Sequence, residues 1–511
     1  MRHVIAAGDR TTAEAAKEIL WVGGNAFDAA VGAVFTAMVA EPSLTSAGGG
    51  GHLMAAPESG KPILFDFFVD MPTKSVQISN LDFFSVDLDF GSAQQEFHIG
   101  KGSVAVPGNV AGLLYVHGRL GTLPRKEILS PAIRAAREGV VLSESQAYLV
   151  NLLSPILTHD EKGAEVFSPN GSLLRAGDRL VMPEFADFLD ALAQDGADLV
   201  YRGEVAKIIS DWAEDGGLLC LEDLAHYQVQ ERSPLRTDFY AYQVLLNPPP
   251  AQSGVLIDAT LSLLQKARRK EATPVSLREL VTSFDVTNQA RRERLPVGST
   301  EGIQFPLSQQ EYFQDYLDRF RRAISLPSGA AGPPPRGATT HVSVLDKVGN
   351  AASVTTTNGE GCGYMLPKAG FILNNMLGEE DLNPRGFHLY PGGTRLPSMV
   401  APTIVLKGRR PVLITGSAGS NRIRSAIAQL LVNCLCNKMS IEEATAAPRV
   451  HLEGNVLHAE PGIPEDSLQK LESRYTVHRW DEQNPFFGGA NSVTLDTGAG
   501  DSRRGGYSLR L

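Results

Sequence analysis

The change in residue type around Thr339 constrains the fold more than any other feature of this sequence. Leu326–Ala338 is rich in proline and glycine, a composition typical of a loop or an interdomain linker. Directly after it, His341–Leu345 and Ala351–Thr357 alternate apolar and polar residues around a turn at Asp346–Asn350, which predicts a β-hairpin. The chain therefore leads through a long irregular segment to a threonine at the start of a strand.

Helical patterns dominate the first two thirds of the chain. Thr11 and Glu14 have the spacing of a capping box, which predicts the start of a first helix. Asn25 is placed to cap a second helix, which ends before Pro42. Apolar periodicity predicts further helices between residues 120 and 325, among them Pro131–Glu138, Glu184–Gln194 and Gln309–Ala323.

Strand patterns are concentrated in the last third. A second hairpin is predicted over residues 401–415, and it leads through Gly416–Asn421 into a helix over Ile423–Cys436. Because helices come first and strands are interleaved later, the sequence favours a layered α+β fold over regular βαβ repeats.

Composition excludes some classes of partner. The 511 residues carry a formal net charge of −10 at pH 7 and a pI near 5.6, which argues against nucleic acid or an anionic membrane as a partner. Two short basic clusters, Lys266–Lys270 and Arg291–Arg294, lie in helical patterns, and we expect them to form solvated faces.

The cysteines do not form the pattern of a disulfide framework or a metal site. Cys434 and Cys436 are too close together for a zinc-binding pair, and no histidine cluster accompanies them. We therefore expect free thiols and no metal ion or other cofactor. The four cysteines are Cys220, Cys362, Cys434 and Cys436.

The sequence carries no evident targeting or membrane signal. Met1–Gly8 lacks the apolar core of a secretory signal, and no run of eighteen apolar residues is present. A cytoplasmic protein is expected, or a periplasmic one if a signal peptide was removed from the sequence.

Thr339 is a candidate nucleophile. If the Ala338–Thr339 bond were cut, Thr339 would carry a hydroxyl and a free α-amine. An α-amine has a pKa of about 7.7–8.0, so it can act as general base for the hydroxyl of the same residue. The alternative is a Thr-Thr pair that starts a strand because of its β-propensity.

Acyl transfer also needs donors for an oxyanion. Gly416–Asn421 enters a predicted helix, and the adjacent amides of Gly419 and Ser420 are suited to this role. The alternatives are an ordinary strand-to-helix turn or a phosphate-binding loop, but the segment lacks the Lys-Ser/Thr ending of a P-loop.

Nine segments in order resemble the gamma-glutamyltranspeptidase family over nearly the whole chain. They are Gly23–Ala30, Glu41–Gly51, Val106–Gly108, Asp223–Tyr227, Asn247–Gly254, Thr339–His341, Asn374-Asn375, Ala401–Val405 and Thr415–Ser417. The resemblance implies an α+β fold, the four-layer αββα sandwich of N-terminal-nucleophile hydrolases. It also implies that a zymogen cleaves itself into residues 1–338 and 339–511, which remain together as a heterodimer in one intertwined domain.

The resemblance assigns roles to the residues around the nucleophile. Thr339 matches the nucleophile and Thr357 matches the second threonine, whose hydroxyl bonds to it. Gly419 and Ser420 fall where the family usually has two glycines that form the oxyanion hole, and only the backbone amide of Ser420 is needed. Ser398 matches the first of two serines that hold the substrate carboxylate.

Other positions depart from the family pattern. Phe68 stands where the family has an arginine that binds the α-carboxylate of a γ-glutamyl group, and a phenyl ring cannot replace that contact. Met399 replaces the second serine, and Met376 replaces a Glu or Gln. Glu379 is the best candidate for binding the substrate α-amine.

Two asparagines complete the predicted substrate site. Asn358 lies in a shortened loop after Thr357, and Asn375 belongs to the paired asparagines of the family. The departures all fall on the glutamyl pocket, which is predicted to be less charged and more apolar than in the family.

The sequence therefore predicts a Thr-dependent amidohydrolase or acyltransferase that acts on γ-glutamyl or related small-molecule amides. Genuine γ-glutamyl hydrolysis or transfer, as in glutathione metabolism, is one alternative, and acylase activity on other amides is another. A catalytically silent binding protein with the same fold is a third. Higher oligomers are compatible with the sequence.

Overall fold

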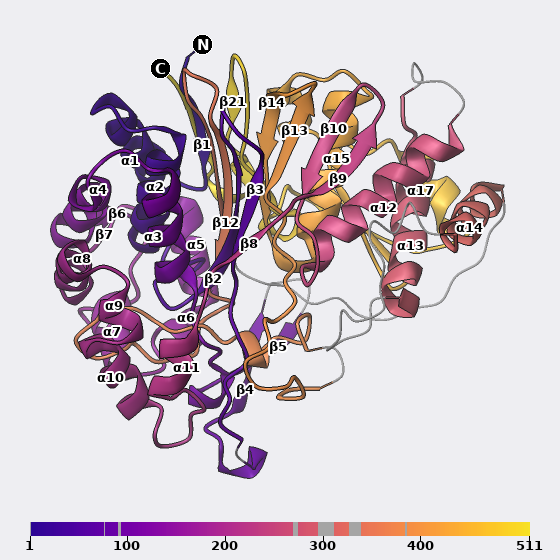
Figure 1. Cartoon of the computed structure of the whole chain (residues 1–511). Helices are drawn as coiled ribbons and strands as arrows, with labels where there is room; N and C mark the ends of the chain where they lie inside the picture. Colours follow the sequence, from indigo (N-terminus) through magenta and orange to yellow (C-terminus); the bar gives the residue numbers. More distant parts are fainter. Residues whose placement is uncertain are drawn as a thin grey trace.

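The computed structural model describes residues 2–75, 77–89, 94–268, 274–294, 311–325, 339–383 and 386–511. The proline- and glycine-rich segment Leu326–Ala338 lies outside these ranges, whereas Thr339 lies inside them. Two β-sheets stand face to face at the centre of the molecule, and helices cover both outer faces (Figure 1).

The first sheet has seven strands within the described residues, and it is antiparallel throughout. In spatial order they are β22 (Tyr507–Arg510), β1 (Val4–Ala7), β11 (Thr340–Leu345), β12 (Ala351–Thr357), β2 (Gly50–Ala56), β3 (Ile63–Phe67) and β8 (Gln230–Arg232). Strands β11 and β12 form the hairpin that the sequence predicts after Thr339, with Val342 opposite Val354.

The second sheet, counted over the same ranges, has six strands. Their order is β21 (Gly498–Ala499), β20 (Ser492–Thr494), β14 (Arg410–Thr415), β13 (Thr403–Lys407), β10 (Tyr242–Leu246) and β9 (Leu235–Phe239). The pair β13 and β14 confirms the second predicted hairpin.

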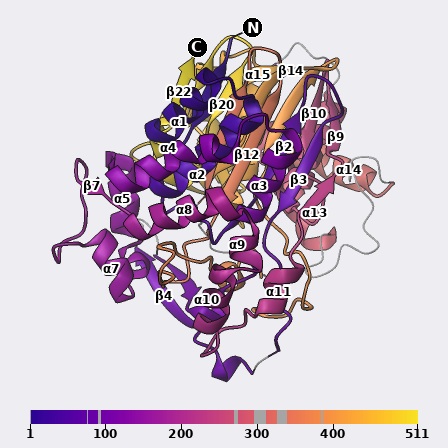
Figure 2. The ribbon, with the colours of Figure 1, turned by 60° about the vertical axis from the view of Figure 1, so that its left-hand side comes forward.

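One helical layer covers the outer face of the seven-stranded sheet (Figure 2). Its main helices are α1 (Arg10–Trp21), α2 (Ala26–Ala40), α3 (Asn109–Leu120), α4 (Arg125–Glu138) and α8 (Pro183–Asp195). Every residue of α2 is buried, because this helix packs on β11 and β12 and is covered by α1 and α4. Its small alanines allow this close packing.

The ends of the first two helices test the predicted caps. Asn25 caps α2 as predicted, since its side chain accepts from the amides of Phe27 and Asp28. The capping box at Thr11 is wrong, because Asp9 occupies the cap position and accepts from the Thr11 amide at 2.7 Å. An aspartate two residues earlier offers the same acceptor, so the helix starts at Arg10.

A second helical layer covers the six-stranded sheet. It consists of α12 (Gln252–Ala267), α13 (Leu277–Arg294), α14 (Phe313–Ser325), α15 (Ile423–Leu435), α16 (Ile441–Ala446) and α17 (Glu465–Glu472). Apolar side chains of α12 and α15 pack together with Val244 and Val405 of the sheet in one buried cluster. Helix α15 follows the predicted oxyanion loop at the predicted position.

A third apolar cluster fills the space between the two sheets. It joins Ala6, Met54 and Leu64 of the first sheet to Leu245 and Ile404 of the second. The layers therefore follow the order helices, sheet, sheet, helices, which agrees with the predicted α+β fold.

Shorter elements surround these layers. They are α5 (Glu144–Leu152), α6 (Ser154–Leu157), α7 (Glu161–Phe167), α9 (Asp198–Tyr201), α10 (Glu204–Trp212), α11 (Leu221–His226), β4 (Phe84–Asp89), β5 (Gln94–Ile99), β6 (Val140–Val141), β7 (Arg179–Leu180), β15 (Ser417–Ala418), β16 (Val450–Glu453), β17 (Val456–Ala459), β18 (Thr476–Arg479) and β19 (Gly489–Ala490). In the part of the chain that the structure describes, no helix is both long enough and apolar enough to cross a membrane.

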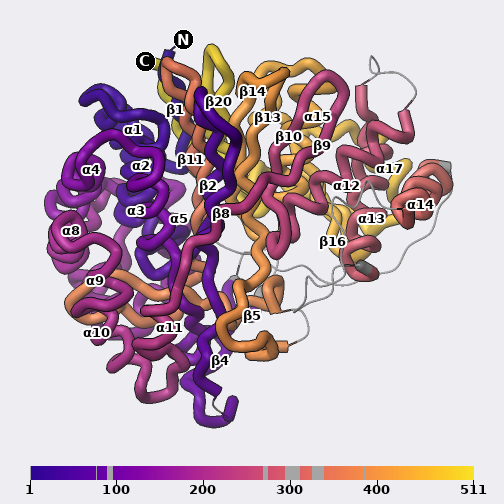
Figure 3. Tube along the Cα trace, in the orientation of Figure 1, coloured from indigo at the N-terminus to yellow at the C-terminus, as the bar shows by residue number. Residues whose placement is uncertain are grey.

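Strands from both sides of the predicted cleavage site alternate in the sheets. β1, which precedes the site, lies between β22 and β11, which follow it. In the second sheet, β10 pairs with β13 across the same division. The chain ends consequently lie side by side, as the tube in Figure 3 shows.

Candidate active site

The strand register brings Thr339 next to Thr357. Thr340, the first residue of β11, is opposite Thr356 of β12, so the preceding residue Thr339 is level with Thr357. Thr357 is in turn opposite Gly50 of β2. The two predicted catalytic threonines therefore meet at one end of the central strands, and both are buried.

Strand alternation directs the two neighbouring threonines to opposite faces of the sheet. Thr340 points toward the helical layer, where its hydroxyl donates to Glu41 Oε2 at 2.5 Å. Ser343, which is on the other face, donates to the Asn491 carbonyl at 3.0 Å. Thr339 shares the face of Ser343, so it lies on the side of the second sheet.

Glu41 is a buried acid that contacts β11 at Thr340, next to the predicted nucleophile. Thr12 donates to its second oxygen at 2.7 Å, so hydroxyls approach both carboxyl oxygens. Burial raises the pKa of Glu41 to about 8, the nearby Asp9 adds to the rise, and the hydrogen bonds from Thr340 and Thr12 oppose it. Sequence reasoning had given this residue no role of its own.

The loop after β12 is held by its own asparagines. Gly359 donates its amide to Thr357 Oγ1 at 3.1 Å. Asn358 accepts from Ser46 Oγ at 2.7 Å, and Asn375 Oδ1 accepts from the Glu360 amide at 2.9 Å. The structure thus engages Asn358 and Asn375, both predicted to bind substrate, in positioning this loop.

Glu379 lies against the same loop. A Cβ atom at Gly359 would lie 2.3 Å from Glu379 Oε1, and Gly359 has a φ of +61°, so glycine suits this position on two grounds. Burial raises the pKa of Glu379 well above its ordinary value, and the carboxyls of Glu360 and Asp381 raise it further. The ionised form of Glu379 is therefore disfavoured at this position.

The predicted oxyanion loop has an unusual backbone. Gly419 and Ser420 are consecutive residues with φ of +114° and +46°. The left-handed region is uncommon for serine, and here the Ser420 hydroxyl is fixed by Asp381 Oδ2 at 2.6 Å. Among the described residues, no acceptor bonds to the amides of Gly419 and Ser420, which agrees with donors kept for a ligand.

His341 fixes the start of this loop. Its ring bonds to Thr355 Oγ1 at 2.7 Å and to Ser343 Oγ at 2.9 Å. A Cβ at Gly416 would lie 2.3 Å from the ring, so a glycine is needed there. Burial lowers the pKa of His341 to about 3, so the ring stays neutral and acts as a spacer between sheet and loop.

The three apolar departures from the family pattern gather in one place. Phe68, Met376 and Met399 belong to a single buried cluster beside the threonine pair. Ser398, next to Met399, lies 3.5 Å from the ring of His52, and that ring stacks on Phe68.

One arginine close to the segment that contains Phe68 is already paired. Arg395 bonds to Asp66 at 2.6 Å and to Asp70 at 2.5 Å. Burial opposes ionisation of Asp66, but His52, Arg395 and Arg232 together hold its pKa well below the ordinary value. This guanidinium is consequently part of the scaffold.

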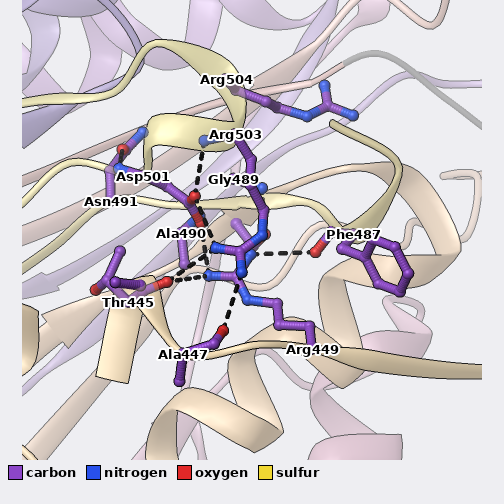
Figure 4. A network of polar contacts seen from close by, with 12 residues as sticks. Thr445, Ala447, Arg449, Phe487, Gly489, Ala490, Asn491, Asp501, Arg503 and Arg504 are labelled. Atoms are coloured by element: carbon purple, nitrogen blue, oxygen red, sulfur yellow. Dashed lines mark hydrogen bonds and ion pairs between the residues drawn. The ribbon is translucent and has the colours of Figure 1, made fainter. Parts of the chain in front are cut away.

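A buried network of polar contacts joins Arg449, Asp501 and Arg503 (Figure 4). Arg449 bonds to Asp501 at 2.5 Å, and Asp501 also accepts from the Ala490 amide at 2.8 Å. Burial alone would raise the pKa of Asp501, but Arg449 and Arg503 hold it below its ordinary value. Since β19, which contains Ala490, pairs with β15, the network fixes the strand that leads into the predicted oxyanion loop.

Comparison with known proteins decides the family. The model of the gamma-glutamyltranspeptidase family matches residues 12–510. The chain belongs to the gamma-glutamyltranspeptidase family. It is thus an enzyme of the amidohydrolase and acyltransferase type, as the sequence motifs indicate.

Relatives within the family carry two different names at equal similarity. The chain is 30% identical to the glutathione hydrolase proenzyme of Escherichia coli (strain K12), over 92% of this chain and 85% of the relative. It is also 30% identical to the acylase ACY 1 proenzyme of Pseudomonas sp. (strain SE83), over 97% of this chain and 90% of the relative. Identity alone does not choose between these activities.

A solved structure confirms the fold. The cephalosporin acylase from Bacillus halodurans superposes with a TM-score of 0.85 and covers 99% of this chain and 95% of its own. The two sequences are 22% identical, so this likeness concerns the fold. The N-terminal-nucleophile α+β fold predicted from the gamma-glutamyltranspeptidase motifs is confirmed.

The predicted exposure of one residue near this site is wrong. Arg291 was expected on a solvated face, yet it is half-buried and contacts Asn421 and Met399. The neighbouring Arg292 is exposed, as expected. Helical spacing contained the signal, because Phe284 and Arg291 are seven residues apart and share the buried face of α13.

The four cysteines are free thiols. None of the four, all of which fall in the described ranges, forms a disulfide. Over those ranges, no three His, Cys, Asp or Glu side chains are arranged to hold a metal ion.

Proposed function

We propose that the chain is a self-processing, Thr-dependent amidohydrolase that cleaves the Ala338–Thr339 bond and then uses Thr339 as its nucleophile. The observation that carries this proposal is the position of Thr339: buried, at the start of β11, and level with Thr357. The names of the 30% identical relatives, both called proenzymes, agree with it.

The two pieces, residues 1–338 and 339–511, would remain one intertwined domain after cleavage. β1 of the first piece is hydrogen-bonded on both sides to strands of the second, and β2 pairs with β12. Separation would break these ladders and expose the cluster between the sheets, so the product is a heterodimer.

Catalysis would follow from groups at one end of the sheet. The free α-amine of Thr339 takes the proton of its hydroxyl, and the oxygen attacks the substrate carbonyl. The amides of Gly419 and Ser420 hold the oxyanion, while Thr357 orients the nucleophile. The amine product leaves, and water or a second amine releases the acyl group.

The preferred acyl group would differ from a γ-glutamyl group near its α-carboxylate. Phe68, Met376 and Met399 form an apolar cluster where the family pattern has polar partners. An acyl-binding surface next to such side chains would favour methylene groups over charged ones.

Intact-mass analysis of the denatured protein, with N-terminal sequencing of each fragment, tests the proposal. Two pieces are expected, the lighter beginning Thr339-Thr340-His341. Thr339→Ala is expected to remain one chain and to cleave no amide. A Thr339→Ala protein that still splits after residue 338, or a wild-type chain that stays whole for days at neutral pH, contradicts it.

A further inference from the structure

Helix α3 has two apolar faces, and only one of them is buried. Val110, Leu113 and Val116 are buried in the apolar core. A second stripe with helical spacing is partly or fully exposed, and it consists of Ala111, Leu114, Tyr115 and Gly118. Because the core does not fully cover this stripe, it is available to a ligand.

The exposed stripe forms one wall of a cavity of about 840 Å³, which we call the Arg125 cavity. The other walls come from Leu123–Arg125 at the start of α4, from Ala197 and α9, and from Tyr227–Val229 after α11. Figure 2 shows α3, α9 and α11 close together. Small-molecule sites have volumes of about 300–1,000 Å³, so the Arg125 cavity is large enough for one.

Two tyrosines make part of this cavity preformed. The rings of Tyr201 and Tyr227 are buried and stack with their centroids 5.5 Å apart. The Tyr201 hydroxyl donates to the Pro107 carbonyl at 2.8 Å, and the Tyr227 hydroxyl donates to the Phe68 carbonyl at 2.6 Å. Because these rings are already fixed, a ligand that contacts them does not have to order them.

The Arg125 cavity is positively charged in a chain whose formal net charge is −10. Its described lining residues include Arg125, Arg202 and His117, and none of them is an aspartate or a glutamate. Arg202 is paired with Asp198 at 2.8 Å. Within the described ranges, by contrast, no carboxylate lies within the 4.0 Å of an ion pair from Arg125, and no acceptor bonds to its guanidinium.

The guanidinium of Arg125 is held at the cavity without being neutralised. Arg125 is half-buried and packs against Gly196, where a Cβ atom would lie 2.0 Å from its Nη1. Gly196 caps the end of α8 with a φ of +71°, and the carbonyl end of a helix favours a nearby cation. The charge is thus kept in place, while the donors of the guanidinium stay open to an anion.

Carboxyls around the cavity have partners of their own. Glu231 accepts from the Tyr115 hydroxyl at 3.1 Å and pairs with Arg119 at 3.4 Å. Asp28 accepts from the loop before α4. These carboxyls do not pair with Arg125, so the partner that its charge lacks is an anion from solution.

We propose that the Arg125 cavity binds a small organic monocarboxylate with a flat apolar body. The carboxylate forms paired hydrogen bonds with the Arg125 guanidinium, and the apolar body covers Leu114 and Tyr115. One unpaired guanidinium matches one carboxylate, and a second charge on the ligand would lose water against an apolar wall. The inference is independent of the proposed amidohydrolase function, because no residue assigned to catalysis or substrate binding lines the cavity.

Saturation-transfer NMR on the purified full-length protein tests the site with two probes of nearly the same shape. Naphthylacetate has the required carboxylate and flat apolar body, and naphthylacetamide lacks only the charge. The carboxylate is expected to bind with a dissociation constant on the order of 1 mM or below, and the carboxamide to bind at least roughly fivefold more weakly.

Gly118 allows the cavity to be filled without disturbing the fold. Apart from its own helix, a Cβ atom at this position meets no atom within 4 Å, so a larger side chain has room. Gly118→Trp places an indole in the cavity and is expected to abolish binding of both probes. Gly118→Ala, the matched control, adds one methyl group and should change either affinity by roughly twofold or less.

Arg125→Met tests the charge. It is expected to weaken binding of naphthylacetate by roughly tenfold, since a charge-assisted hydrogen bond is lost, and of naphthylacetamide by roughly twofold or less. Lys126→Met removes an exposed charge from the next residue and should leave both affinities unchanged.

Several results would overturn the site. Naphthylacetate that does not bind at roughly 10 mM, or equal affinities of the two probes for the wild type, would do so. Unchanged binding in a folded Gly118→Trp protein also overturns it, because the probe then lies elsewhere, for example at the threonine pair. If Gly118→Trp does not fold, Arg125→Met decides: a loss for the carboxylate alone supports the site, and unchanged affinity or an equal loss for both probes overturns it.

Discussion

Two buried carboxyls in different parts of the fold, Asp501 and Glu41, have opposite charge states. Asp501 is paired with Arg449 at 2.5 Å and with Arg503 at 3.2 Å, and these arginines keep it ionised. Glu41 is bonded to the hydroxyls of Thr340 and Thr12, and burial keeps it protonated to about pH 8. Depth of burial is similar in the two cases, so the partners decide the charge.

The difference shows where this fold tolerates a fixed charge. The Asp501 pairs fix β19, which pairs with the strand that leads into the predicted oxyanion loop. Glu41 contacts Thr340, the residue after the proposed nucleophile Thr339, and a permanent negative charge there would favour protonation of the α-amine of Thr339. A protonated amine cannot act as a base, so a neutral acid at this place suits the proposed chemistry.

The largest expected effect concerns the pH dependence of stability at Glu41. Between its ordinary pKa of 4.5 and about 8, only the unfolded chain releases this proton, so stability falls as pH rises through that window. At about 1.4 kcal/mol per pH unit, the contribution reaches at most about 5 kcal/mol by pH 8. Glu41→Gln should remove this slope.

Urea unfolding in a Thr339→Ala background measures this slope, because the uncut chain cannot separate into two subunits as it unfolds. The difference in unfolding free energy between the protein that retains Glu41 and its Glu41→Gln variant should change little below pH 4.5 and most between pH 4.5 and about 8. Parallel pH profiles for the two proteins would show that Glu41 is ionised in the folded state and would remove the contrast with Asp501.

Removing the ion pairs of Asp501 should lower the free energy of unfolding by about 3–5 kcal/mol. Asp501→Asn leaves Arg449 buried without a countercharge, and an uncompensated buried charge is strongly destabilising. The urea midpoint in the same background reports the change. Asp198→Asn, which removes the exposed pair with Arg202, is the matched control and should cost about 1 kcal/mol or less. Equal effects of the two substitutions would refute this explanation.

The smallest expected effect concerns Asp381, which interacts both with a hydroxyl, as Glu41 does, and with an arginine, as Asp501 does. It accepts from the Ser420 hydroxyl at 2.6 Å and interacts with Arg291, while burial raises its pKa. Ser420→Gly removes the hydrogen bond and relieves a φ of +46°, so stability should change by about 1 kcal/mol or less. Amide hydrolysis should stay within roughly threefold of wild type, since the backbone amide remains. A loss of activity above roughly tenfold would assign the hydroxyl a direct role.

Local patterns in the sequence were sufficient for the hairpins and one of the two predicted caps. Alternation in residues 341–357 depends only on which side each residue faces, and it predicted β11 and β12 correctly. Asn25 was predictable because a cap bonds to residues two and three positions away. The cap predicted at Thr11 was wrong for an equally local reason, because Asp9 accepts from the amide at the start of the same helix.

Contacts across long sequence distances could not be predicted from local patterns. Glu41 and Thr340 are separated by 299 positions, and only the folded sheet brings them together. Arg291 was expected in solvent because charged residues usually are, and its burial depends on Gln252 and Asn421 from other helices and loops. The gathering of Phe68, Met376 and Met399 followed from the family resemblance, which carries three-dimensional information that periodicity lacks.

The pairing of β1 with β22 also makes a rearranged gene feasible. Val4 is opposite Arg510, and the Leu511 amide donates to the His3 carbonyl at 2.9 Å, so a short linker could join the two ends. A circularly permuted chain could then begin at Thr339, once an initiator methionine is removed. Such a protein would present the threonine amine from the moment of synthesis, which would separate the role of Thr339 in cutting the backbone from its role in turnover.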